Sequence, residues 1–420
     1  MSTTSRRRIG PALSALLMVL TVFGPISMDL YLPALPALTR ELGTTTSVAQ
    51  FTITACLIGL AVGQLIAGPL SDRFGRRGPL LIGITAFAAA SALCAVSPTI
   101  ETLVVARLVQ GLAGAVGIVI SQAAGRDVYE GGALIRYYGR LTVMGGLAAI
   151  VGPVIGGQLV RFTDWRGLFL FLAGIGVLLL ALCLVIFRET LPATQRTTGG
   201  LRHTGRDFRR LLSDRLFVGA VLITGFAFAA IFAYLAGATY ILQGIYGLSP
   251  QGYSVAFGAN SAGVMLFGYL GGRSAERWSE RGTLVVGLAM CAAGALGLLA
   301  TGLFALPLPV VLASLFIMVS GGAGATAAPT TSLALADYPE LAGTASSMLG
   351  LTRYAFGGVA APLVGLAGAN NVLPLGIVTT CAIGLVGVTY VALVGRERNP
   401  RIADSVAFAA VEANQRVTSE

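Results

Sequence analysis

Lysine is absent from the 420-residue sequence, histidine occurs once, at His203, and only 11% of the residues are charged. A nucleotide-binding P-loop needs a lysine that reaches the phosphates, so the chain has no ATP site of this kind. The lone histidine lies in a polar stretch, which excludes an imidazole relay through the apolar segments. The five cysteines show no paired or metal-ligand spacing, and HExxH and GxSxG motifs are missing. We therefore expect no cofactor, no metal site and no enzymatic activity.

Apolar residues, by contrast, make up 55% of the sequence and give a mean hydropathy of +0.82. A helix needs about 20 apolar residues to cross a bilayer. Uncharged stretches of roughly this length or longer cover 9–28, 42–71, 78–100, 141–160, 167–187, 216–272, 282–336 and 354–395. The two longest hold two spans each, interrupted at 244–250 and 307–309, and the last is interrupted near Asn370. The pattern predicts an all-α membrane protein with twelve transmembrane helices.

A repeat divides these helices into two sets of six. The segment 68–78 (GPLSDRFGRRG) recurs in weaker form at 272–282, Asp127 has a counterpart at Asp337, and Pro153 in the fifth span matches Pro362 in the eleventh. We expect an N-terminal half at 1–187, a linker at 188–215, a C-terminal half at 216–395 and a tail at 396–420. In transporters built from such repeats, the substrate site lies between the halves.

The positions of the arginines predict the orientation. Arg107 and Arg353 fall within spans, Arg40, Arg161 and Arg166 fall in loops on one side, and the other 23 of the 28 arginines fall on the opposite side. Positively charged loops stay in the cytoplasm, so both termini are expected there. The net charge of +10 lies in short loops beside the spans, which points to anionic membrane lipids as partners rather than nucleic acid.

Three charges inside spans are the first candidates for function, since a charge in hydrocarbon costs about 3 kcal/mol or more. With the first span ending near Leu35, Asp29 and Arg107 each lie about 9 Å inside the outer boundary. We expect a pairing that substrate or a conformational change releases in favour of a proton. The alternative is that Asp29 caps a helix disrupted by Pro33 and Pro36. Arg353, about 14 Å deep, either binds an anionic or carbonyl-bearing substrate, balances Asp29 or reaches backbone carbonyls.

Four segments resemble one transporter family. They are 28–36 (MDLYLPALP), 68–77, 107–111 (RLVQG) and 152–157 (GPVIGG). Over nearly its whole length the chain resembles the major facilitator superfamily. Within it, the chain is similar to the twelve-span drug:proton antiporters of the bicyclomycin and chloramphenicol resistance (Bcr/CflA) type.

The resemblance implies roles for particular residues. It implies a gate at the cytoplasmic side, in which Arg76 pairs with Asp127, Asp72 faces the start of the eleventh helix, and the contacts latch the two halves. This gate comprises Gly68, Asp72, Arg73, Gly75, Arg76, Arg77 and Asp127. The family's antiporter motif corresponds to Gly145, Gly152, Pro153, Gly156 and Gly157. Arg107 is implied in proton transfer and Asp29 as the proton or substrate site.

The expected function is proton-coupled efflux of drugs or antibiotics across a bacterial inner membrane by a monomer, with amphenicol- or bicyclomycin-like amphiphiles as substrates. An aromatic, weakly polar cavity for them would be built from Tyr31, Phe226, Phe228, Tyr234, Tyr240 and Asn260, with Asp29 and Arg353. The alternative is a proton-coupled importer or uniporter of a small metabolite, although such carriers usually hold more polar groups at mid-membrane than this chain offers.

Overall fold

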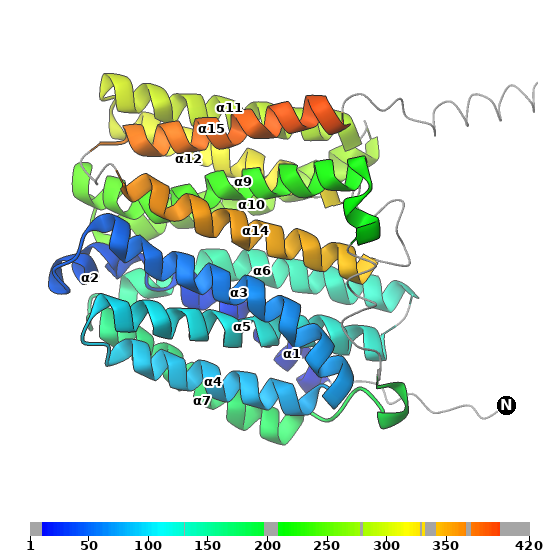
Figure 1. Cartoon of the computed structure of the whole chain (residues 1–420). Helices are drawn as coiled ribbons and strands as arrows, with labels where there is room; N and C mark the ends of the chain where they lie inside the picture. Colours follow the sequence, from blue (N-terminus) through cyan, green and yellow to red (C-terminus); the bar gives the residue numbers. More distant parts are fainter. Residues whose placement is uncertain are drawn as a thin grey trace, which may run out of the picture.

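The computed structural model describes residues 11–129, 131–196, 209–277, 280–327, 330–331, 342–366 and 371–394. These residues form helices and connecting turns, with no strand among them, so the predicted all-α class is confirmed. Figure 1 shows the long helices running side by side through the molecule.

Six passes make up the first group of helices. They are α1 (Pro11–Asp29) with the short η1 (Leu32–Ala34) and α2 (Leu35–Glu41), then α3 (Thr46–Phe74), α4 (Arg77–Ala95), α5 (Ile100–Val128), α6 (Gly131–Leu159) and α7 (Trp165–Ile186). The first pass is broken after Asp29 because Pro33 and Pro36 lack the N–H that a continuous helix needs. Side-chain caps start α3, α5 and α7; at α3, Thr45 accepts the N–H of Val48 at 3.3 Å.

A second group follows the short η2 (Ala193–Gln195). It consists of α9 (Arg215–Tyr240) with η3 (Ile241–Ile245), α10 (Pro250–Arg277), α11 (Glu280–Phe304), α12 (Leu308–Val319) with η4 (Ser320–Ala325), α14 (Ala342–Gly365), and α15 (Leu373–Thr389) with η6 (Tyr390–Val394). The predicted interruptions at 244–250 and 307–309 coincide with the turns before α10 and α12. Among the described residues, ten helices are long and apolar enough to cross a membrane. The other two passes of the predicted twelve are α10 and α14.

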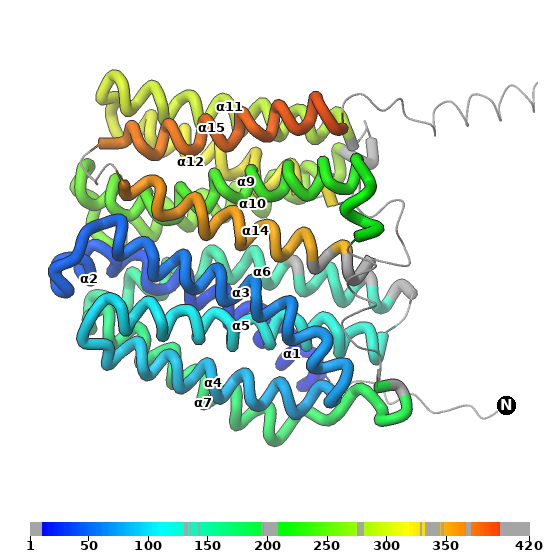
Figure 2. Tube along the Cα trace, viewed as in Figure 1, coloured from blue at the N-terminus to red at the C-terminus, as the bar shows by residue number. Residues whose placement is uncertain are grey.

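The two groups meet along two helix pairs. In the first group α3 packs on α5, α4 on α7 and α1 on α6; in the second α14 packs on α9 and α11 on α15. Between the groups, α14 lies along α3 and α10 lies along α6, and Figure 2 shows the first group below the second in that view. The helices α10 and α14 therefore line the boundary between the groups. The domain limits given above remain a prediction.

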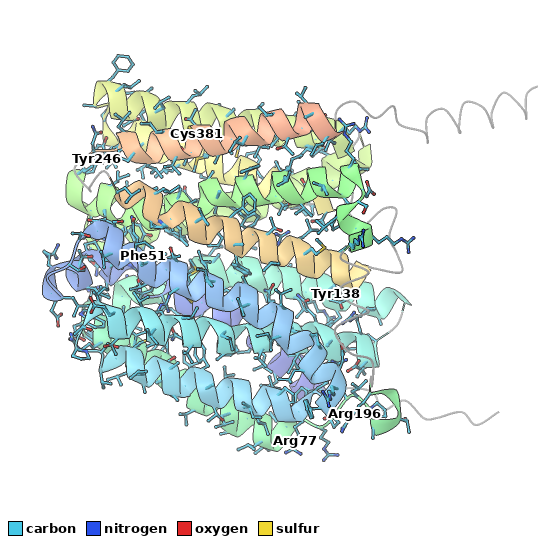
Figure 3. All side chains as sticks on the ribbon, viewed as in Figure 1. Phe51, Arg77, Tyr138, Arg196, Tyr246 and Cys381 are labelled. Carbon is cyan, nitrogen blue, oxygen red and sulfur yellow. The ribbon has the colours of Figure 1, made fainter. Side chains whose placement is uncertain are left out.

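The two ends of the bundle differ in character. The turn at 68–78 lies at the end where Figure 3 labels Arg77 and Arg196, and Tyr246 lies at the opposite end. We name these the predicted cytoplasmic end and the predicted external end, following the distribution of arginines.

Candidate functional site

Asp29 is the last residue of α1, at the break in the first pass. Its side chain is partly accessible and faces Gly152 of α6, where an added Cβ would lie 3.1 Å from the Cβ of Asp29. Within the described chain, its carboxylate makes no hydrogen bond or ion pair. The helical pass that contains Asp29 continues to Glu41, beyond Leu35. The structure therefore leaves an unpaired carboxyl group within the first apolar pass.

Arg107 lies beside this break and is fully buried in α5. Its Nη1 donates to the Ser27 carbonyl at 3.1 Å and to Gln110 Oε1 at 2.6 Å. The guanidinium also lies over the rings of Tyr31 and Phe169, 4.4 and 5.5 Å from their centres. Its Nε and Nη2 have no hydrogen-bond partner. Arg107 is thus a buried cation held by neutral groups.

The expected Asp29–Arg107 pairing is absent from this conformation. No ion pair joins the two side chains, although Asp29 lies within electrostatic range of Arg107. The estimated depths were similar, but the chain turns away after Asp29, and the Arg107 guanidinium points to the last turn of α1 instead. The two groups interact through their fields and not through a hydrogen bond.

The second group of helices brings phenols to the same place. Tyr234 of α9, Tyr253 of α10 and Tyr354 of α14 all lie within electrostatic range of Asp29. Tyr234 accepts a hydrogen bond from Asn260 Nδ2 at 2.8 Å, while the Tyr253 hydroxyl is buried without a partner. Asp29 therefore lies within electrostatic range of groups from both halves of the molecule.

Sequence reasoning missed Tyr253 and Tyr354. A signal existed for Tyr253, because Tyr253, Phe257 and Asn260 follow the spacing that places residues on one helix face. Tyr354 directly follows Arg353 in the sequence, but its position does not predict whether the side chain points to lipid or to the boundary between the halves.

Two predicted substrate residues lie elsewhere. Tyr31 is fully buried, with its hydroxyl 2.8 Å from Thr52 Oγ1 and its ring under Arg107. Tyr240 is buried near the predicted external end, where its hydroxyl lies 2.7 Å from Thr39 Oγ1 of the first half. In this conformation Tyr31 holds Arg107 in place, and Tyr240 helps to join the two halves.

Arg353 on α14 has no acidic partner among the described residues. Its guanidinium lies over the ring of Phe228, 5.0 Å from the centre, and its Nε is buried without a hydrogen bond. Phe226 instead meets Phe356 edge to face at 5.0 Å. Arg353 neither pairs with Asp29 nor donates a hydrogen bond to a backbone carbonyl here, so its N–H groups remain available.

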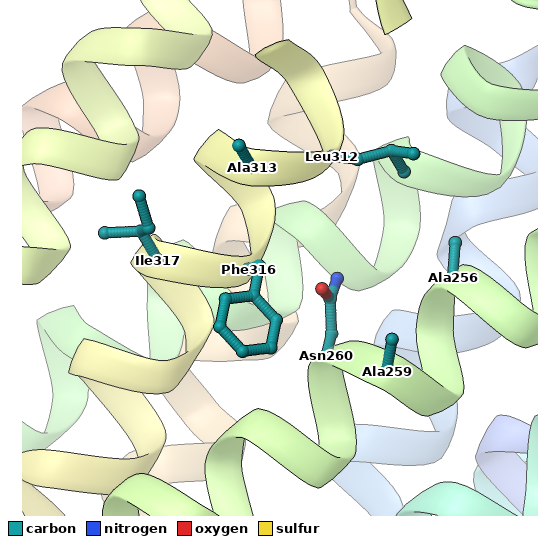
Figure 4. A pocket seen from close by; sticks show the side chains of 7 residues that line it. All are labelled: Ala256, Ala259, Asn260, Leu312, Ala313, Phe316 and Ile317. Carbon is teal, nitrogen blue, oxygen red and sulfur yellow. The ribbon is translucent and has the colours of Figure 1, made fainter. Parts of the chain in front are cut away.

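Asn260 borders a cavity between α10 and α12 of about 390 Å³. Figure 4 shows its amide beside Phe316 in an otherwise apolar lining. The other lining residues are Ala256, Ala259, Leu312, Ala313 and Ile317. Asn260 therefore connects this cavity to Tyr234 and, through it, to the surroundings of Asp29.

The turn at 68–78 forms a separate charged cluster, centred on the buried Arg76. Its guanidinium donates to both oxygens of Asp127, at 2.9 and 3.2 Å, so the predicted Arg76–Asp127 pair is found. Nη1 also donates to Asp72 at 2.5 Å and to the Ser71 hydroxyl at 2.8 Å. Every charged partner of Arg76 belongs to the first half.

The backbone of this turn is held by Glu189, which follows α7. Its carboxylate accepts the N–H groups of Arg76 and Arg77 at 2.7 and 3.2 Å. Burial raises the pKa of Glu189, but these hydrogen bonds and Arg196 outweigh it and leave the pKa below its usual range. Gly75 has φ +89°, and a Cβ there would lie 2.8 Å from Arg196 Nη2, so only glycine fits.

The remaining gate residues also contact their own half. Arg77 donates to the Leu184 carbonyl at 3.1 Å, Arg73 lies over Phe74, and the Gly68 carbonyl accepts the Ser71 hydroxyl. The predicted latch between the halves is therefore absent from the described contacts of this cluster. The predicted contact of Asp72 falls on the first residues of the eleventh helix, whose side chains lie outside the described residues.

The antiporter motif on α6 mostly serves close packing. A Cβ on Gly156 would collide with the Leu30 carbonyl of α1, and one on Gly157 would lie 3.1 Å from the Pro250 carbonyl of α10. Gly152 brings α6 against Asp29. Gly145 differs, because a Cβ there would meet nothing within 4 Å, so close packing does not require a glycine at that position.

Hydrogen bonds between the halves gather toward the predicted external end. They run from Thr39, Ser47, Gln50 and Thr54 of the first half to Tyr240, Pro362, Ala236 and Gly358, and from Thr239, Gln243, Gln251 and Ser261 of the second half to Leu32, Pro33, Gly157 and Ala149. Nearer the predicted cytoplasmic end, no hydrogen bond joins the halves within the part of the chain that is described. The conformation is therefore closed at the predicted external end.

Known proteins resemble this chain over most of its length. The sequence model described as Major Facilitator Superfamily matches residues 17–362. An uncharacterized MFS-type transporter, YdgK, of Bacillus subtilis (strain 168) is 37% identical over 91% of this chain and 95% of that protein. A bicyclomycin resistance protein homolog of Haemophilus influenzae is 28% identical over 82% and 87%. A chloramphenicol resistance protein of Pseudomonas aeruginosa is 28% identical over 96% of each.

A solved structure has the same fold. A bacterial homolog of the human lysosomal transporter Spinster, in an inward-facing and unoccupied conformation, matches with a TM-score of 0.71 over 90% of this chain and 95% of that one. The sequence identity is 12%, so the likeness concerns the fold alone. The predicted twelve-helix fold and the resemblance drawn from the four motifs are thereby confirmed.

Proposed function

Since the chain belongs to the major facilitator superfamily, we propose that it exports small amphiphilic drugs across a bacterial inner membrane in exchange for protons. Relatives named for resistance to bicyclomycin and chloramphenicol support this choice and make such compounds the first substrates to test. In this proposal the protein acts as a monomer, its halves are 1–187 and 216–395, and both termini and the linker are cytoplasmic.

The observation that carries the proposal is the unpaired carboxyl group of Asp29. It lies inside the membrane, at the boundary between the halves, and no described group forms a hydrogen bond or ion pair with it. A negative charge there is opposed by the C-terminal end of α1, since a helix C-terminus carries partial negative charge. It is favoured by the field of Arg107. A group balanced in this way gains and loses a proton as its surroundings change.

The exchange follows from this balance. With the external end open, Asp29 takes a proton from the higher external proton concentration. Closure at the external end, as in this structure, separates it from that side, and the buried positive charge of Arg107 then favours release toward the cytoplasm. A drug entering from the cytoplasm is carried outward when the halves rock back. Arg107 acts as a fixed charge, because neutral groups hold it in place.

Substrate contacts are proposed for the second half. Arg353 and Phe228 offer N–H donors beside a ring, which suits a carbonyl, nitro or carboxylate group attached to an apolar body. Tyr234 and Asn260 offer a weakly polar surface close to Asp29. These contacts come from α9, α10 and α14, which all adjoin the boundary between the halves.

Drug susceptibility and transport in proteoliposomes test this function. Expression of the wild type in an efflux-deficient bacterium is expected to raise the inhibitory concentration of chloramphenicol or bicyclomycin, and Asp29→Asn to abolish the increase at equal expression. In proteoliposomes, an imposed pH gradient is expected to drive drug movement by the wild type only. Drug movement that ignores the gradient would exclude proton coupling, and accumulation of a metabolite with the proton flow would establish an importer instead.

A further inference from the structure

Proline residues inside helices leave one backbone carbonyl without its usual partner. In an α-helix the carbonyl of residue i accepts the N–H of residue i+4, and proline has none. Pro153 in α6 thus frees the Ala149 carbonyl, and Pro362 in α14 frees the Gly358 carbonyl. At membrane depth no bulk water replaces the lost donor, so a neighbouring helix has to supply one.

A hydroxyl group of the opposite half fills both positions. Ser261 of α10 donates to the Ala149 carbonyl at 3.1 Å, and Thr54 of α3 donates to the Gly358 carbonyl at 2.9 Å. The two contacts are alike, because Pro153 and Pro362 are matched positions in the repeat and α6–α10 and α14–α3 are the two helix pairs at the boundary. One arrangement therefore occurs twice, once on each side.

These hydroxyls behave differently from most others in the bundle. Most helical serines and threonines here donate to a carbonyl of their own helix, as Thr224 does to Ala220 and Ser254 to Pro250, both at 2.8 Å. Thr54 and Ser261 donate across the boundary instead. The prolines at other positions show no such arrangement: no described side chain donates to the Thr21 or Leu65 carbonyls, which Pro25 and Pro69 free.

Among the described residues, the two contacts are also the innermost hydrogen bonds between the halves. Thr54 lies eight residues into α3, about 12 Å from its external end, and Ser261 lies eleven residues into α10, about 16 Å from its end. The other hydrogen bonds between the halves lie closer to the predicted external end. Thr54 and Ser261 therefore form the innermost hydrogen bonds of the external closure among the described residues.

We propose that Thr54 and Ser261 are positioning residues that hold the externally closed conformation through the two proline-freed carbonyls. In each contact, both the hydroxyl and the carbonyl have a hydrogen-bond partner whether the external end is closed or open. When the halves part at the external end, water reaches the carbonyl, and the hydroxyl turns to a carbonyl one turn back on its own helix. Neither group is left unpaired in either state, so the closure is reversible. This role is independent of what the carrier transports and of whether protons drive it.

External accessibility of a buried reporter measures the closure. Thr239→Cys, in a protein without the native cysteines, places a thiol at a fully buried position. In the wild type, the Thr239 hydroxyl at this position contacts the first half. The readout is the rate of its reaction with a membrane-impermeant maleimide in full-length protein in lipid vesicles. Ser261→Ala and Thr54→Val are each expected to raise this rate about threefold, the effect of one average hydrogen bond between membrane helices. Thr54→Ser keeps the hydroxyl and is expected to keep the original rate.

Restoring the backbone N–H provides the decisive comparison. With Pro153→Ala present, the Ala149 carbonyl regains a partner in its own helix, so adding Ser261→Ala is expected to change the rate little. Pro362→Ala is expected to cancel the effect of Thr54→Val in the same way. Ser254→Ala on α10, whose hydroxyl bonds its own helix, serves as the matched control and is expected to leave the rate unchanged.

The proposal is overturned if Ser261→Ala and Thr54→Val leave the rate at the original value, or if their effects persist in full beside the proline replacements. An equal increase of the reaction rate in Thr54→Ser and Thr54→Val would also overturn it, because the hydroxyl would then have no part in the closure. Thermal unfolding of each variant separates a change in closure from a loss of folding, since a misfolded variant loses its unfolding transition.

Discussion

Two buried arginines of the first half are held in opposite ways. Arg76 donates to two carboxylates, Asp127 and Asp72, and a hydroxyl, whereas Arg107 meets a carbonyl, an amide oxygen and two rings. A buried cation with carboxylate partners is fixed by them, because losing one partner leaves a charge uncompensated. A buried cation without them projects its field onto nearby groups. The difference suggests that Arg76 stabilises the scaffold and Arg107 acts on Asp29.

The largest expected effect is on transport by Arg107→Gln. Removing the buried charge removes the field that favours the charged form of Asp29, so pH-driven drug transport is expected to fall to the level of empty vesicles. Stability is expected to be kept, since the variant also removes the cost of burying an uncompensated charge. Transport in proteoliposomes and the thermal unfolding midpoint are the measurements. Wild-type transport by Arg107→Gln would remove the distinction between the two arginines.

Arg76→Gln is expected to have the reverse profile. It leaves Asp127, whose side chain is 11% exposed, without its ion-pair partner, and breaking such a pair destabilises by about 3 kcal/mol. The unfolding midpoint in detergent is expected to drop clearly, while protein that remains folded keeps its response to a pH gradient. Arg73→Gln is the matched control, because Arg73 is exposed and makes no ion pair with a described residue. An equal drop of the unfolding midpoint in Arg73→Gln would show that the loss of any charge in this turn destabilises the protein, whether or not that charge is buried and paired.

A third arginine sharpens the comparison, since Arg353 has neither carboxylates nor a closed shell of neutral groups. Arg353→Ala is expected to weaken binding of carbonyl- or carboxylate-bearing drugs about tenfold, the value of one charge-assisted hydrogen bond. Arg353→Lys is expected to recover part of the loss, because it restores the charge without the planar fork. Scintillation proximity binding would measure this, and equal affinity in all three proteins would remove Arg353 from the site.

The smallest effect is expected at Glu189, which holds the backbone beneath Arg76. Its pKa is lower when folded than when unfolded, so its contribution is fully present above the unfolded value of about 4.3 and is lost as pH falls through the folded value. Glu189→Gln is therefore expected to lower the unfolding midpoint slightly at pH 7, and the difference from the wild type is expected to shrink as pH falls below the unfolded value. A constant difference across this pH range would contradict the assignment.

Part of the site was predictable from sequence because hydropathy and charge report burial directly. A carboxyl group at Asp29 and guanidinium groups at Arg107 and Arg353 are rare inside apolar spans, so each was identified without coordinates. The Arg76–Asp127 pair followed from the family motif. The Asp29–Arg107 pairing is absent from this conformation, because depth along two helices does not determine the direction of side chains where a helix breaks.

The sequence by itself determined the twelve passes, the two matched halves, the prolines at matched positions and the three membrane charges. These depend on local properties, namely the length of apolar runs and the absence of an N–H in proline. Only the tertiary structure decided that Arg107 has no carboxylate partner among the described residues, that Tyr253 and Tyr354 lie within electrostatic range of Asp29, and that Ser261 and Thr54 reach the proline-freed carbonyls. Those contacts join residues 80 or more positions apart, and the relative placement of whole helices sets them.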